Sequence, residues 1–472
     1  MTPSFRSIAV ACVVLLPALA AAQWQHLDSL PQVQREGNTV VFTAAADSGR
    51  TEHVAVSVLS PEVVRVRFSP VAFGRDHSDA VVDRQLGAQD FRFESTASGS
   101  VIATASLRVE VQAAPFRLTI KDAEGRVIHA DDPGRGMAHD GSAVRAWTTL
   151  RDTDNVYGFG EKNGAFNKRG WALGGYHYVM WNSDTYGYDS STDPIYASVP
   201  FYLVLREGRA HGVFLDNTHR SSFDIGRERR GLLSFGADGG ELDYTVIAGP
   251  HPRDVVRRYA QLTGRAPLPP RWALGYHQSR WSYYPEARVR RLADTFRQEQ
   301  VPADTLWLDI DYQDEFKPFT WSAERFPDPA KLVADLREQG FRTVVILDPH
   351  PTKEPGYRIF DEGVAGEHFV KNPDGTLFEG PVWPINAPNK PGNSVFPDFT
   401  RPATREWWGR QHRVFTDVGI AGIWNDMNEP AVWVPPANTM PDDVRFDHEG
   451  QPTNHAEVHN LYGCLLYTSR RG

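Results

Sequence analysis

Cysteine is scarce in this sequence of 472 residues, which contains only Cys12 and Cys464. Cys12 lies within an apolar N-terminal run, so a chain without that run keeps one thiol and forms no internal disulfide. The cross-links that stabilise many small secreted domains are therefore excluded. We expect the stability of this protein to come from large buried cores.

Excess positive charge is also lacking, because 50 Lys and Arg residues stand against 59 Asp and Glu, which gives a net charge of −9. Nucleic acids and anionic membranes attract proteins through clustered positive charge. We therefore expect no nucleic-acid partner.

Cofactor and metal motifs are absent from the sequence pattern. The segment from Gly158 to Gly160 is too short to cradle a phosphate group. His455 and His459 have the i, i+4 spacing of zinc ligands, but the glutamate and third ligand of a zinc hydrolase are missing. The sequence therefore predicts no cofactor and no metal.

The N-terminal apolar run is too short to cross a membrane. Arg6 precedes the run from Ile8 to Leu16, and Pro17 and a series of small residues follow it. A membrane span needs about 20 apolar residues, whereas this pattern is typical of a secretory signal peptide. We predict that residues 1–22 are a signal peptide, that the protein has no membrane anchor, and that it is exported to the periplasm or the exterior.

Aromatic residues are abundant, with 13 Trp and 16 Tyr. Most must belong to the core, but flat rings at a surface are also suited to stack on the apolar faces of sugars. The length of the chain is sufficient for two or three domains.

The region 23–250 has the pattern of an all-β domain. Short runs such as Val54 to Leu59, Val63 to Phe68 and Leu107 to Gln112 alternate apolar and polar residues, and turn residues separate them. This pattern predicts an N-terminal β-sandwich.

The pattern changes near Pro250, where predicted helices begin to alternate with predicted strands. A helix is expected from Arg253 to Leu262, before this alternation. The expected strands are 273–278, 305–310, 343–347 and 422–425, and the expected helices are 286–300, 329–339 and 404–417. Such βα units predict the first half of a (β/α)8 TIM-type barrel over residues 251–463. A doubly wound open sheet is the structural alternative.

Asp426 follows the apolar strand in Gly422-Ile-Trp-Asn-Asp-Met-Asn-Glu-Pro430. At the carboxyl end of a barrel strand, its carboxylate would face the active-site side and could attack an anomeric carbon. An N-capping aspartate before a helix is an equally good interpretation of the spacing alone.

The segment Trp424-Asn-Asp-Met-Asn-Glu-Pro430 resembles the nucleophile motif of glycoside hydrolase family 31, in the form found among α-glucosidases and glucosidase II-like enzymes. The resemblance extends from Val156-Tyr-Gly-Phe-Gly-Glu161 to Gly463. It implies that Asp426 is the nucleophile, that Glu429 supports the site, and that Met427 lies beside the substrate.

The strand at 305–310 ends in a second acidic motif, Trp307-Leu-Asp-Ile-Asp-Tyr-Gln-Asp314. Its Asp-x-Asp pattern could bind a divalent metal, as in a glycosyltransferase, but a calcium loop is disfavoured because the required Gly and Glu are missing. The resemblance implies instead that Asp309 hydrogen-bonds the hydroxyl groups of the terminal sugar. Asp311 and Asp314 are weaker candidates.

The resemblance also implies five further substrate-binding residues, which are Trp281, Trp383, Trp424, Ile346 and Asp184. The three tryptophans and Ile346 would line the sugar pocket, although core packing is the usual role of a single tryptophan. Asp184 would reach the pocket from a loop of the β-rich domain, although an Asx turn would also explain it.

The second carboxyl group of a retaining glycosidase is not identified in this sequence. The resemblance places that acid/base later in the barrel, beyond four strands, and residues 464–472 do not continue the family pattern. We therefore expect an incomplete catalytic barrel, a non-native tail at 464–472, and no activity without the missing acid/base.

The predicted function is hydrolysis of terminal non-reducing α-linked glucose from oligosaccharides by a retaining, exo-acting α-glucosidase. The alternatives are an α-xylosidase, sulfoquinovosidase or α-glucosyltransferase of the same family, a sugar-binding relative without catalysis, and a metal-dependent glycosyltransferase built around Asp309 and Asp311.

Overall fold

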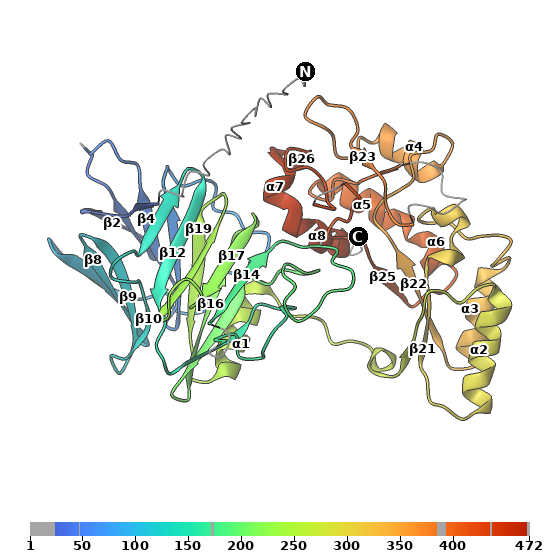
Figure 1. The fold of residues 1–472 in the computed structure, drawn as a ribbon, viewed down its shortest axis with the longest axis horizontal. Coiled ribbons are helices and arrows are strands. Elements are labelled where there is room, and N and C mark those ends of the chain that lie inside the picture. The colour runs from blue at the N-terminus through green and yellow to red at the C-terminus, as the bar shows by residue number, and fades with distance from the viewer. Residues whose placement is uncertain (1–23, 47, 171–173, 385–392, 435–436, 470–472) are drawn as a thin grey trace, which may run out of the picture.

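The computed structural model describes residues 24–46, 48–170, 174–384, 393–434 and 437–469. The predicted signal peptide, residues 1–22, lies outside them. Within the described residues the chain forms a β-rich part, followed by a part in which helices surround a small parallel sheet (Figure 1).

The β-rich part contains an eight-stranded antiparallel sheet, with the order β13-β15-β16-β19-β5-β4-β3-β2. Its strands are β2 (Gln32–Glu36), β3 (Thr39–Thr43), β4 (His53–Ser60), β5 (Val63–Ser69), β13 (Asp154–Gly158), β15 (Phe201–Arg206), β16 (Arg209–Leu215) and β19 (Leu242–Ala248).

Two further antiparallel sheets complete this part. The six-stranded sheet contains β1 (Gln25–His26), β11 (Met137–Asp140), β12 (Ala143–Thr149), β18 (Leu232–Ala237), β17 (Ser221–Ile225) and β14 (Tyr176–Met180). The five-stranded sheet contains β10 (Val127–Ala130), β9 (Phe116–Asp122), β8 (Leu107–Ala113), β7 (Gly99–Ala103) and β6 (Arg92–Thr96).

One large core joins these sheets. Strand β9 shows how the sequence builds it, because Phe116, Leu118 and Ile120 are fully buried and the residues between them are partly exposed. Strand β19 is buried at every position, so it packs on both faces. The predicted β-sandwich is confirmed. Strand β15 begins at Phe201, after a loop that contains Ile195.

The second part is organised around a four-stranded parallel sheet with the order β20 (His277–Gln278), β21 (Thr305–Leu308), β22 (Arg342–Leu347) and β25 (Gly422–Asn425). Spatial order follows chain order without a reversal, as in a barrel and unlike a doubly wound sheet. The expected strand at 273–278 is short, because Arg271–Leu274 forms the 3-10 helix η2.

The helices between these strands include α2 (Glu286–Gln298), α3 (Pro329–Glu338), α5 (Pro402–Gln411) and α6 (Arg413–Thr416). Helix α3 begins with strong local signals, since the Asp328 carboxylate accepts a hydrogen bond from the Lys331 N–H at 2.9 Å and Pro329 occupies the first turn. Their apolar faces join the sheet in a second core that contains Trp408 and Phe415.

Smaller elements extend this second part. They are α4 (Arg358–Ala365), β23 (Glu379–Gly380), β24 (Ser394–Val395), β26 (Arg445–His448), β27 (Gln451–Asn454), α7 (His455–Val458) and α8 (Tyr462–Thr468), with the 3-10 helices η3 (Ile310–Tyr312), η4 (Asp314–Phe316) and η5 (His459–Leu461). In α8, Leu466 is fully buried. The proposed non-native character of 464–472 stays a prediction.

Helix α1 (Pro252–Thr263) follows the last strand of the sandwich and packs against it. Val255 and Leu262 are buried there, and the ring of Tyr259 stacks on Phe201 with centroids 4.1 Å apart. Among the described residues, no helix is long and apolar enough to cross a membrane.

A polar contact joins the loop after β14 to the segment around η5. The Trp181 ring stacks on the His459 imidazole with centroids 3.6 Å apart. The Asn460 amide donates hydrogen bonds to the carbonyls of Met180 and Thr218, and its oxygen accepts one from the Asn182 N–H. These contacts fix the position of the loop that carries Asp184.

We predict that Asn460→Ala lowers the free energy of unfolding by about 2 kcal/mol, because three hydrogen bonds between the two parts are lost and their backbone groups are left unsatisfied. Denaturant unfolding checks this value. Asn372→Ala is the matched control, since its side chain bonds only within its own exposed turn. Equal destabilisation by the two variants would contradict the prediction.

Candidate active site

The parallel register places the predicted site residues on one face of the sheet. Ile346 of β22 pairs with Trp424 of β25, and Trp307 of β21 pairs with Val344. Since side chains alternate along a strand, Asp309 belongs to the row of Ile346 and Trp424. Asp426 follows on the same face in the next row, at the carboxyl ends of the strands.

Asp426 follows the last residue of β25 and is half-buried. Its Oδ1 accepts a hydrogen bond from the Met427 N–H at 2.9 Å, and Met427 has a φ of 56°. Residues 427–430 form bends and turns, so no helix begins here for Asp426 to cap. Burial raises the pKa of Asp426 above its ordinary value, although the bond from Met427 opposes this rise.

Asp309 has the same local geometry at the end of β21. Its Oδ1 accepts a hydrogen bond from the Ile310 N–H at 2.7 Å, where η3 begins. Burial raises the pKa of Asp309 to about 6, and the negative charges of Asp426 and Asp311 add to the rise. Asp309 and Asp426 therefore share one electrostatic environment, as expected for neighbouring strand ends.

Glu429 and Asp184 complete a group of four acids. Glu429 is 8% exposed, and its Oε2 has no hydrogen-bond partner among the described residues. Burial raises the pKa of Glu429 to about 8, with further contributions from Asp184 and Asp426. The pKa of Asp184 is raised by burial and then by Asp426. The loop after β14 thus brings an acid of the β-rich part close to Asp426.

Aromatic rings border this acidic group. Trp281 is 56% exposed and meets Trp383 edge to face at 5.6 Å between ring centroids. Trp383 in turn stacks on Trp433 at 6.0 Å. Trp424 is half-buried and contacts Trp307. Exposed rings at strand ends and loops are suited to bind sugar faces.

The second acidic motif does not assemble as a metal site. Asp311 accepts a hydrogen bond from the Trp281 indole N–H at 3.1 Å and lies 3.9 Å from Arg325. Asp314 is exposed on η4. Among the residues that the structure describes, a group of His and Asp side chains has potential ligand atoms close enough together to bind a metal ion. That group contains neither Asp309 nor Asp311. Asp311 therefore orients Trp281.

Two residues of this site have no signal in the local sequence. Trp433 joins the aromatic border only through its contact with Trp383. Tyr196 lies in the same loop as Asp184 and donates a hydrogen bond to the Thr185 carbonyl, and its pKa is raised by burial and by charges that include Asp184 and Glu429. Both residues are recognised as part of the site from their contacts in the folded structure.

The buried carboxyl of Glu429 predicts a pH dependence of stability. Its pKa is about 8 in the folded chain and 4.5 in a model peptide. Between these values the folded state keeps a proton that the unfolded state releases, so stability falls as pH rises through this range. Glu429→Gln removes this effect.

The quantity to compare is the melting temperature of Glu429→Gln minus that of the unchanged protein. We expect this difference to be higher at pH 8 than at pH 4.5, by about 3 °C or more. Calorimetry at both pH values measures this difference. Glu406→Gln, whose side chain is 71% exposed, serves as the control and should show no such trend. A pH-independent effect of Glu429→Gln would refute the assignment.

The comparisons with known proteins agree with this arrangement. The N-terminal galactose mutarotase-like domain of glycosyl hydrolase family 31 matches residues 53–224, and the family 31 TIM-barrel domain matches residues 266–470.

Among curated proteins, alpha-glucosidase 2 of Bacillus thermoamyloliquefaciens is 40% identical over 428 residues, covering 90% of this chain and 52% of that protein. Human neutral alpha-glucosidase AB is 35% identical over 318 residues, covering 62% of this chain and 33% of that protein. The chain thus spans about half the length, or less, of the curated relatives it matches.

Among solved structures, a Flavobacterium johnsoniae family 31 dextranase complexed with isomaltotriose superposes with a TM-score of 0.85 at 31% identity, covering 94% of this chain and 52% of that one. Together, the two matched domains, the relatives and the arrangement of strand-end acids establish that this chain belongs to glycosyl hydrolase family 31.

Proposed function

We propose that this protein is an exported, retaining, exo-acting α-glucosidase that removes terminal α-linked glucose from oligosaccharides. The observation that carries this proposal is the position of Asp426 at the end of β25, within a group of acids that includes Asp309, Glu429 and Asp184. The similarity to alpha-glucosidase 2 supports the choice of substrate.

In this proposal Asp426 is the nucleophile. The Met427 N–H binds one carboxylate oxygen, which leaves the other available to attack the anomeric carbon. Attack forms the bond between Asp426 and C1 while the glycosidic C–O bond breaks, and the leaving oxygen takes a proton from a second carboxyl group. Water then attacks C1 and gives its proton to the second carboxylate while the bond between C1 and Asp426 breaks, which releases glucose and restores both carboxyl groups.

Glu429 lies close enough to Asp426 for the two carboxyl groups to interact electrostatically. With a pKa near 8, its carboxyl is largely protonated at neutral pH, so it adds little repulsion to the ionised Asp426. Asp309 offers its remaining oxygen to sugar hydroxyls, and Asp184 approaches from the β-sandwich. Trp281, Trp383 and Trp424 pack on the apolar faces of the sugar.

The nucleophile assignment predicts a covalent glucosyl ester at Asp426. A fluorinated α-glucosyl fluoride is a suitable probe, because fluoride leaves readily without a proton from the second carboxyl group. Mass spectrometry should then find the label on the peptide that contains Asp426, and Asp426→Ala should lose the label. In an enzyme that also carries the second carboxyl group, Asp426→Ala should lower turnover by several orders of magnitude. Label on another residue would sink the assignment.

The sugar-reading role of Asp309 predicts that, in an enzyme that also carries the second carboxyl group, Asp309→Asn lowers kcat/KM for nitrophenyl α-glucoside by about 100-fold or more, because a buried hydroxyl contact is lost. Its melting temperature should change by less than about 2 °C. Asp314→Asn is the control from the same motif. Rescue of the variant by manganese or calcium would instead favour a metal role.

Because the chain is also similar to a dextranase, the proposed activity includes more than one type of α-glycosidic linkage. Kinetics of an enzyme that also carries the second carboxyl group, on isomaltose, maltose and a longer α-1,6-glucan, distinguish the possibilities. Release of glucose alone supports exo action, whereas release of larger oligosaccharides from the glucan would replace this proposal with a dextranase activity.

A further inference from the structure

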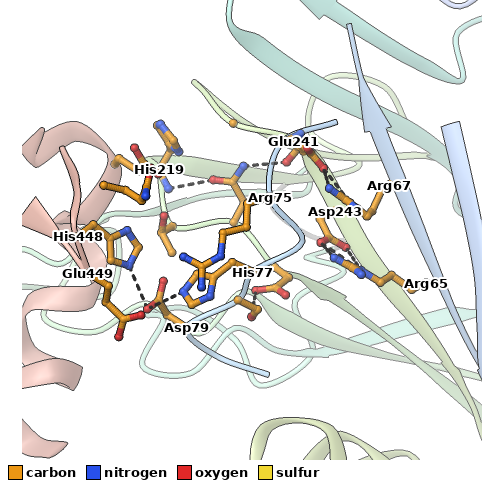
Figure 2. Close-up of a pocket in the computed structure, with 18 residues that line it drawn as sticks. Arg65, Arg67, Arg75, His77, Asp79, His219, Glu241, Asp243, His448 and Glu449 are labelled. Carbon is orange, nitrogen blue, oxygen red and sulfur yellow. Dashed lines mark hydrogen bonds and ion pairs between the residues drawn. The ribbon is translucent and has the colours of Figure 1, made fainter. Parts of the chain in front are cut away.

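A cavity of about 320 Å³ lies where the β-sandwich meets the second part of the chain (Figure 2). On one side it is lined by the loop after β5, which includes His77 and Asp79. On the other side it is lined by the β26–β27 hairpin, which includes His448. None of the acids proposed for catalysis lines this cavity.

Two imidazoles converge on one carboxylate oxygen in this cavity. The Nε2 atom of His448 lies 3.2 Å from Oδ1 of Asp79, and the Nε2 atom of His77 lies 3.5 Å from the same oxygen. The two imidazole rings are 5.6 Å apart at an angle of 73°. All three potential ligand atoms lie within 4.8 Å of one another. Figure 2 shows His77 and His448 on either side of Asp79.

These separations suit a tetrahedral metal site. Zinc bonds imidazole nitrogen and carboxylate oxygen at about 2.0–2.2 Å, so neighbouring ligand atoms of a tetrahedral site are about 3.4 Å apart. Both separations that involve Asp79 are close to this value. The exposed loop that carries His77 leaves room for small adjustments, and cavity water can supply the fourth ligand.

The donor set selects the kind of metal. Two imidazoles and one carboxylate suit zinc and similar transition metals, whereas calcium and magnesium require oxygen ligands. A simple ion pair between Asp79 and His448 would need no second imidazole on the same oxygen.

The charges around the cavity also favour a cation. Six carboxylates line it, against three arginines. Two of these arginines are already engaged, because Arg65 is bidentate to Asp243 and Arg67 binds Glu241. Arg75 is exposed to solvent. The remaining carboxylates include Glu449 and Glu457, which lie on the same side of the cavity as His448.

We propose that His77, Asp79 and His448 bind a zinc-like divalent cation, which cross-links the β-sandwich to the β26–β27 hairpin. The sequence predicts no metal site because His77 and His448 are 371 positions apart, and only the fold brings them together. The role is structural: a cation that binds only when both parts are in place stabilises their association.

The test uses the full chain, treated with a chelator and then titrated with zinc or cobalt. Calorimetric titration and elemental analysis should find one tightly bound metal per chain, and cobalt should give the visible absorption of a site with nitrogen and oxygen ligands. Zinc should also raise the melting temperature. Asp79→Asn and His448→Gln should each weaken binding by more than about tenfold.

His77→Gln is the decisive variant, because it removes one ligand and keeps the hydrogen bond between Asp79 and His448, so the fold should persist. It should lose the cobalt spectrum and the rise in melting temperature. His251→Gln, an exposed histidine outside the cavity, should keep both. Zinc binding by His77→Gln as tight as in the unchanged chain, absence of saturable binding, or stabilisation by calcium and not by zinc would each overturn the proposal.

Discussion

The contact of the β14 loop with η5 is the interaction on which the candidate active site depends. Trp181 stacks on His459, and Asn460 bonds Met180, Asn182 and Thr218. Asp184 follows two residues after Asn182, so this anchor determines where its carboxylate lies. Without it, the strand ends would still present Asp309 and Asp426, but the wall of the site contributed by the β-sandwich would be displaced.

Burial of several acids in one place has an electrostatic cost that the surrounding fold must offset. Hydrogen bonds from the Ile310 and Met427 N–H groups reduce this cost for Asp309 and Asp426. Glu429 has no such bond at Oε2 and keeps its proton instead. Two different solutions therefore operate side by side: hydrogen-bonded carboxylates at the strand ends and a largely protonated carboxyl at Glu429.

Helices and strands with strong local sequence signals were predicted from the sequence. Strand β25 begins at Gly422 and ends at Asn425 as expected, and α3 has its Asp328 cap and its proline. The first strand of the parallel sheet is shorter than predicted, because residues 271–274 form a 3-10 helix. A short apolar run in the sequence does not show whether the residues form such a helix or a strand. Helix 404–417 is divided at His412 into α5 and α6.

The site was predictable to the extent that its residues follow strands. The positions of Asp309 and Asp426 required only strand ends and a parallel sheet. The placement of Asp184 depended on the family resemblance, since an Asx turn explains its local sequence equally well. Trp433, Tyr196 and the pairing of His77 with His448 depend on contacts between distant segments, for which a single sequence carries no local pattern.

The contribution of Asp184 from one part of the chain and Asp426 from the other places the candidate active site at an interface between the two parts. A sugar that contacts both carboxylates would bind the docked arrangement more tightly than any separated one. By thermodynamic linkage, the free energy by which bound substrate stabilises the docked arrangement equals the free energy by which docking strengthens substrate binding. Substitutions at the Trp181–His459 contact would therefore change the affinity for the sugar.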